Sequence, residues 1–145
     1  MTKEVLEAAR TCLKQLTGLD ILMDPQPLTS SKPHLRLTFT GTGDAGETHD
    51  LLYFQLSIVG AGDGPDVYLP KVINASLAIA DLYRNAYVDF KANEALSVRI
   101  GFPDTLSNSG QFVRQGEEET ENSSWAYVYT EPHVITLDFN RSLRG

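Results

Sequence analysis

Residues 116–140, GEEETENSSWAYVYTEPHVITLDFN, change character halfway along their length. Four glutamates fall within five residues at the start, and an alternation of apolar and polar side chains follows. Alternation with a period of two is typical of a strand that buries one face. The second half therefore predicts two strands, at about 125–129 and 134–139. The pair Glu131-Pro132 separates them as a bulge or an edge break, because proline cannot donate a ladder hydrogen bond.

The acidic half belongs to a longer segment, at about 104–124, with few apolar residues. We expect this segment to be a long flexible acidic loop. Neighbouring carboxylates in a loop repel one another and stay solvated, whereas a catalytic pair needs two carboxylates held in different environments. We therefore expect an interaction role rather than a catalytic one, with a weak divalent-cation site completed by a neighbouring subunit as an open alternative. The residues concerned are Glu117, Glu118, Glu119 and Glu121.

The sequence upstream adds further strands and two helices. Apolar and polar residues alternate at 35–39, 52–58 and 96–100, which predicts three more strands. Apolar stripes with helical spacing predict helices at about 3–17 and 68–85. We expect the stripe of the second helix to lie on the sheet, and its residues are Leu69, Val72, Ile73, Ser76, Leu77, Ala80 and Tyr83. This order predicts an α+β fold, with a mostly antiparallel sheet of about four to five strands and two main helices packed on one face.

The composition limits the class of protein. A chain of 145 residues with 41% hydrophobic residues is about one ordinary domain, so we expect a single unit over 1–145. The net charge of -7 argues against a general nucleic-acid binder, which needs clustered Lys and Arg. The single cysteine, Cys12, excludes an internal disulfide and fits a reducing compartment, and its place on the first helical stripe predicts burial. No stretch approaches the ~18 apolar residues of a membrane span, which favours a protein made in a cytoplasm.

Residues suited to metal binding or hydrolysis are few and poorly spaced. The best candidates lack any ligand spacing such as H-x-x-x-H, and adjacent residues such as His49 and Asp50 point to opposite faces of a strand. The stretch GTGDAG, at 41–46, satisfies the dinucleotide fingerprint, but a strand follows where that motif requires a helix. We therefore predict no enzyme, no cofactor and no metal site. The residues best suited to such a site are His34, His49, Asp50 and His133.

Four pieces of the chain, taken in order, carry a resemblance to a known family. They are the helix EVLEAARTCLKQL (4–16), the strand LLYFQLSIVG (51–60), the helix YLPKVINASLAIADLY (68–83), and the ending SSWAYVYTEPHVITLDF (123–139) that follows the acidic loop. In this order the chain resembles the tail terminator proteins, also called minor tail or tail completion proteins, of long-tailed bacteriophages.

The resemblance implies a structural part of the virion rather than an enzyme. Such a subunit assembles as a homo-hexameric ring on the finished tail tube, ends its polymerisation and offers a docking surface to the head connector. The implied partners are copies of the chain itself, the tail tube protein and the head connector or neck protein, while DNA only passes through the lumen. The implied locations are the host cytoplasm before assembly and the tail or neck of the virion afterwards, without a membrane. If the acidic loop lined the lumen, its charges would repel passing DNA.

Two other classes of function stay open at this point. Another neck or head-tail joining component would follow the same ring logic. A small domain that binds a peptide or ligand would instead use the sheet face away from the helices, where Tyr53, Gln55 and Ser57 give mixed polarity. An enzyme with an unrecognised site is the third alternative.

Overall fold

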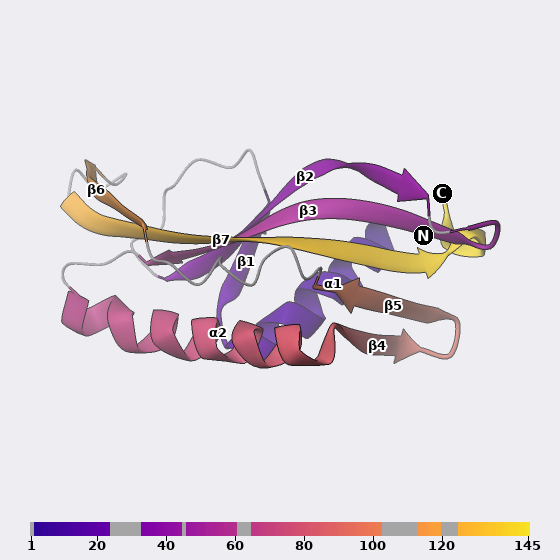
Figure 1. Ribbon diagram of the computed structural model, residues 1–145, viewed down its shortest axis with the longest axis horizontal. Coiled ribbons are helices and arrows are strands. Elements are labelled where there is room, and N and C mark those ends of the chain that lie inside the picture. The colour runs from indigo at the N-terminus through magenta and orange to yellow at the C-terminus, as the bar shows by residue number, and fades with distance from the viewer. Residues whose placement is uncertain (1, 24–32, 45, 61–64, 103–112, 120–124) are drawn as a thin grey trace.

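The fold combines two α-helices with a curved sheet, and is α+β as the sequence predicts (Figure 1). The computed structural model describes residues 2–23, 33–44, 46–60, 65–102, 113–119 and 125–145. The helices are α1 (Thr2–Thr17) and α2 (Pro65–Asn85), and the strands are β1 (Asp20–Met23), β2 (His34–Asp44), β3 (His49–Gly60), β4 (Tyr87–Asn93), β5 (Leu96–Gly101), β6 (Val113–Glu119) and β7 (Trp125–Asn140). A short 3-10 helix, Arg141–Leu143, follows β7.

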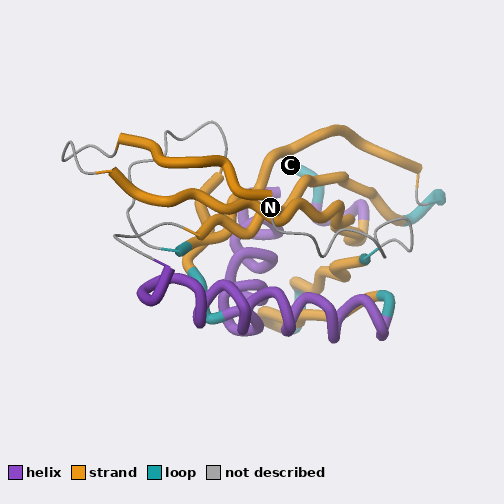
Figure 2. The backbone as a smooth tube through the Cα atoms, turned by 60° about the vertical axis from the view of Figure 1, so that its left-hand side comes forward, coloured by secondary structure: helices purple, strands orange, loops and turns teal. Residues whose placement is uncertain are grey.

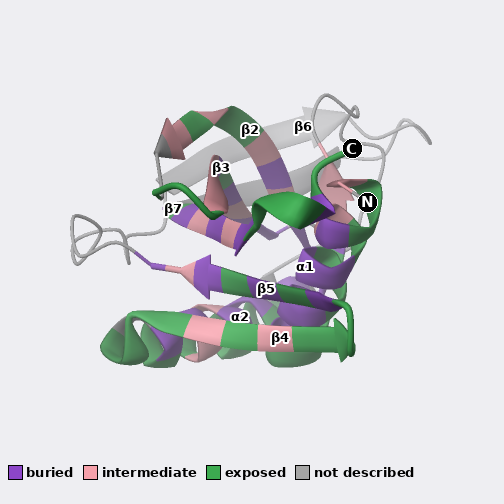
Figure 3. Ribbon diagram, turned by 90° about the vertical axis from the view of Figure 1, so that its right-hand side faces the viewer, coloured by how far each residue is buried: buried purple, intermediate pink, exposed green. Residues whose placement is uncertain are grey.

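The long strand β7 holds the sheet together, because three other strands pair with it. Its residues 129–140 pair with β3 along one edge. Along its other edge it pairs with β6 at 125–130 and with β5 at 136–139. The main path of the sheet is β1-β2-β3-β7-β5-β4, and Figure 3 shows this order from β2 at the top to β4 at the bottom.

The predicted number of strands is too low, and the sheet is mixed. Seven strands lie within the described residues, where four to five were expected, and β1 pairs with β2 in parallel while the other pairs are antiparallel. The short β1 has too few residues to show a period. The missed strand β4 alternates half-buried Val88 and Phe90 with exposed neighbours, a weak pattern that directly follows a helix. The pairing of these strands with stronger neighbours outweighs their weak local signals.

The expected interruption at Glu131-Pro132 is absent, since β7 is one continuous strand. Pro132 lies opposite Ser57 of β3. On the other edge of β7, β6 pairs only as far as Thr130 and β5 begins at Thr136, so no described strand pairs with residues 131–135 there. A proline removes one backbone donor, and a position with a partner on one edge alone tolerates that loss.

The core lies between one face of the sheet and both helices (Figure 2). Alternate residues of four strands point into it, because side chains on a strand alternate between its faces. They are Leu35 and Leu37, Phe54, Leu56 and Ile58, Val98 and Ile100, and Ile135, Leu137 and Phe139. Buried residues of both α1 and α2 belong to the same cluster as these strand residues. On the opposite face Gln55 is exposed, and Tyr53 and Ser57 are half-buried.

The helices lie close to their predicted positions. Helix α1 ends at Thr17, and Gly18 follows with a positive φ of 74°, its N–H donating to the Lys14 carbonyl at 2.8 Å, as expected for a glycine cap. Cys12 is 3% exposed, so its predicted burial is confirmed, and burial raises the pKa of its thiol to about 11. No described helix combines the length and the apolar character needed to span a membrane.

The two ends of the chain lie side by side (Figure 1). The Thr2 N–H donates to the Gly145 carbonyl at 2.9 Å, and the Gly145 N–H donates to Thr2 Oγ1 at 3.1 Å. The last residues after β7 therefore reach back to the first turn of α1.

Candidate functional site

The main path of the sheet ends in two outer edges of different chemistry. Within the described residues, no strand pairs with the outer edge of β1 or of β4. An outer edge presents backbone N–H and C=O groups that another chain can use. These edges are the first candidate surface for interaction.

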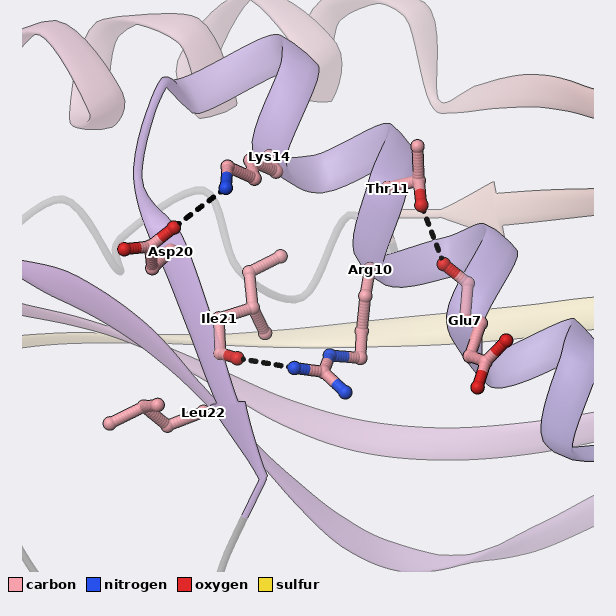
Figure 4. A pocket seen from close by; sticks show the side chains of 7 residues that line it. All are labelled: Glu7, Arg10, Thr11, Lys14, Asp20, Ile21 and Leu22. Atoms are coloured by element: carbon pink, nitrogen blue, oxygen red, sulfur yellow. Dashed lines mark hydrogen bonds and ion pairs between the residues drawn. The ribbon is translucent and has the colours of Figure 1, made fainter.

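The β1 edge is partly covered by basic side chains of α1 (Figure 4). Arg10 donates from Nη2 to the Ile21 carbonyl at 2.9 Å, and Lys14 Nζ lies 2.8 Å from Asp20 Oδ1. They border a cavity of about 590 Å³ between α1 and β1, with Glu7 on the same helix. The contacts of Arg10 and Lys14 fasten β1 to α1. The charges of the two basic and two acidic side chains that line the cavity cancel, so it offers no net charge to a ligand.

The β4 edge carries an exposed polar cluster. Arg99 of β5 donates to both carboxylate oxygens of Asp89, at 2.7 and 3.0 Å, and its guanidinium lies 3.9 Å from the centroid of the Tyr87 ring. The hydrogen bond from Arg99 lowers the pKa of Asp89, and the same bond raises the pKa of Arg99. This bidentate pair stiffens the β4–β5 hairpin on the face away from the helices.

The structure separates the four residues that were weighed for metal binding or hydrolysis. His34 and His133 are 2% and 4% exposed, on different strands. His49 instead meets Asp138 of β7, with 2.7 Å between Nδ1 and Oδ1, while Asp50 pairs with arginines. The expected divergence of His49 and Asp50 is thereby confirmed. Among the described residues, no group of three or more His, Cys, Asp or Glu could hold a metal ion.

Asp50 is the centre of an ion-pair cluster that sequence reasoning missed. Arg144 donates to its two oxygens at 2.9 and 2.5 Å, and Arg141 donates to Oδ1 at 3.2 Å. Arg141 also donates to the carbonyls of Gly46 and His49, at 2.9 and 3.2 Å. Hydrogen bonds from Arg144, followed by those from Arg141, lower the pKa of Asp50. The cluster ties the end of the chain to the β2–β3 hairpin beside a cavity of about 640 Å³. Asp50 and Arg144 lie 94 residues apart, so no local sequence pattern predicts the cluster.

Helix α2 exposes a second apolar stripe. Tyr68, Val72 and Ile79 are buried against the sheet, whereas other apolar residues of the same helix face outward. The sequence prediction assigned residues of both stripes to one buried face, which is wrong for the exposed set. The exposed residues are Leu69 at 37%, Ile73 at 42% and Leu77 at 60%.

The acidic segment divides between strand and undescribed residues. Glu117, Glu118 and Glu119 lie in β6, whose backbone pairs with 125–130 of β7, so the expected loop is wrong for Val113–Glu119. The strand-forming sequence of β7 offers a pairing edge, and this pairing outweighs the poor strand propensity of consecutive glutamates. The other residues of 104–124, including Glu121, lie outside the described residues.

No protein-family model matches the chain, and the search of curated proteins gives no significant match.

Proposed function

We propose that this chain is a structural ring subunit of the tail terminator type. In this proposal it caps the tail tube of a long-tailed bacteriophage, ends tube polymerisation and presents a docking surface to the head connector. The observation that carries the proposal is the pair of unlike outer edges, β1 and β4, on one sheet. A closed ring needs two different surfaces on each subunit that fit head to tail.

Different side chains surround the two edges. This difference favours pairing of β1 of one copy with β4 of the next copy over pairing of two β1 edges or two β4 edges. At β1 the carbonyl of Ile21 is already bound by Arg10, and Leu22 is half-buried. At β4 the side chains of Asp89 and Lys91 are exposed and the hairpin is held by Arg99. The mixed polarity of the sheet face away from the helices adds a third surface for a tube or connector protein.

The acidic residues have an electrostatic role in the same proposal. Glu117, Glu118, Glu119 and Glu121 would repel DNA phosphates if they faced the lumen, so that DNA passes without sticking. The resulting virion component needs no cofactor, and its partners are further copies of itself, the tail tube protein and the connector. A head-tail joining component elsewhere in the neck is the second candidate, since it also needs two unlike ring surfaces.

The test is the mass and shape of the assembly, with and without tail tubes. Sedimentation velocity and negative-stain microscopy should show six copies of the 16.0 kDa chain, or rings seated on tube ends. A variant with the four glutamates changed to Gln should form the same rings but support fewer infections. Rings that bind a connector but leave tubes uncapped would favour the joining component instead. Single chains and uncapped tubes after mixing would contradict the ring proposal altogether.

A further inference from the structure

The outer stripe of α2 has a regular spacing along the helix. We define it as Leu69, Ile73, Leu77 and Ala80, all exposed. Their steps of four, four and three residues keep them on one side of a helix, away from the buried Tyr68 and its row. Such a row on a helix surface suits packing against a second helix.

Opposite charges lie beyond the two ends of the outer stripe. Asp66 precedes Leu69 by three residues and Arg84 follows Ala80 by four, so both continue the same row. Asp66 and Arg84 are exposed. The row thus begins with a carboxylate, continues with apolar side chains and ends with a guanidinium, over about 27 Å of helix.

The row is complementary to itself when a copy is turned round. Asp66 and Arg84 lie nine residues on either side of position 75, and Ile73 and Leu77 lie two residues on either side of it. In an antiparallel pair of helices centred there, the carboxylate of each copy meets the guanidinium of the other, and Ile73 meets Leu77. A parallel pair would instead place like charges together, which is unfavourable.

We propose that a second copy of this chain binds α2 through the outer stripe, as an antiparallel helix pair with a two-fold axis near position 75. The charge complementarity of the row with its own reverse selects a second copy as the occupant. Arg84 now makes a pair with Asp81 at 3.4 Å, with the two side chains 80% and 69% exposed. An exposed pair of this kind is weak and exchanges readily for one across the interface.

This contact differs from the contact that closes a ring. A two-fold contact uses the same surface on both copies and is complete at two, whereas a ring needs two unlike surfaces. If rings form, the outer stripe joins two of them back to back. The two contacts can therefore be lost separately, and the proposed function does not depend on this one.

The first test measures association of the wild-type chain and of two variants matched in charge. Sedimentation equilibrium over about 10 µM to 1 mM suits a small interface with modest affinity. Leu77→Asp should lower the association constant at least about tenfold. Asn74→Asp adds the same charge on an exposed position of α2 off the stripe and should leave association within about threefold. Where rings form, the same comparison is made between double and single rings.

The second test fixes the direction of the helix pair. D66K and R84E should each weaken association, because each places two like charges together, and the double variant D66K/R84E should restore it. Circular dichroism checks that each exposed substitution leaves the fold intact. A wild-type chain that stays single at 1 mM, equal losses in Leu77→Asp and Asn74→Asp, or a double variant as weak as the singles would each overturn the proposal.

Discussion

Asp50 shows how one carboxylate holds distant parts of the chain together. It receives hydrogen bonds from Arg141 and Arg144, while Arg141 also binds backbone carbonyls of the β2–β3 hairpin. The last residue then bonds with Thr2. Loss of this one carboxylate would leave two arginines near each other without a counter-charge, and the C-terminal segment would lose its main fastening.

The substitution Asp50→Asn should destabilise the protein at neutral pH and cost less stability in acid. Because the arginines lower the pKa of Asp50, the charged form binds best in the folded state. Its contribution is present above the ordinary aspartate pKa and is lost as pH falls through the lowered value. Urea unfolding of both proteins at about pH 7 and about pH 3 measures the difference.

Asp81→Asn provides the matched control for this prediction. Asp81 is exposed and pairs with Arg84 at 3.4 Å on the surface of α2, so its loss should change the unfolding free energy by less than about 0.5 kcal/mol. An Asp50→Asn protein that matches the wild type at neutral pH, or that loses the same stability at both pH values, would refute the role given to the cluster.

At the scale of elements, the sheet depends on close contacts along β7. Gly101 of β5 lies opposite Thr136, and a Cβ at Gly101 would lie 2.4 Å from Thr136 Oγ1. Thr136 is β-branched and its rotation is restricted, so it has little room to move away. Gly101 thus leaves room for β5 to pair with β7 at Thr136, the first residue of β7 that pairs with β5.

Gly101→Ala should therefore lower the unfolding free energy by about 1–3 kcal/mol through overpacking. In the double variant with Thr136→Ala the nearest atom to the new methyl group would be Cβ of residue 136, at 3.8 Å, which is ordinary contact. The double variant should recover most of the loss beyond the cost of Thr136→Ala alone, as measured by a double-mutant cycle in urea. Additive losses would show that the close contact is not the cause.

Sequence patterns predicted the fold class and the elements with the clearest periods. They failed for strands that form mainly because a neighbouring strand pairs with them. The stripe of α1 and the alternation of β3 and β5 have clear periods, so their positions followed from local sequence. In contrast, β1, β4 and β6 are strands because neighbours pair with them. The outer stripe of α2 was assigned to the core because apolar residues occupy both sides of that helix. Composition gives no sign of which side faces the sheet.

For the whole molecule, the adjacency of the ends has a practical consequence. Thr2 and Gly145 bond directly, so a short linker can join the ends without strain. New ends can be opened in the exposed turn between β4 and β5, at residues 94 and 95.

A circular permutant joined through a short Gly-Ser linker and opened between residues 94 and 95 should fold. We expect its far-ultraviolet circular dichroism to match the wild type, and its unfolding free energy to fall by no more than about 3 kcal/mol. The matched control is a permutant opened inside β7 between Val134 and Ile135, where the break divides a buried strand. Equal folding of both permutants would contradict the central place given to β7.

Because β7 is the last strand to be translated, the sheet can be completed only late in synthesis. Strands β3 and β5 are translated before it and are joined in the sheet only through it. Until β7 leaves the ribosome, β2 and β3 can form one hairpin and β4 and β5 another, but each keeps an unpaired edge. Pairing over such long sequence separations makes folding slow. Nascent chains halted before residue 125 should therefore be the species most prone to aggregate, and most dependent on chaperones.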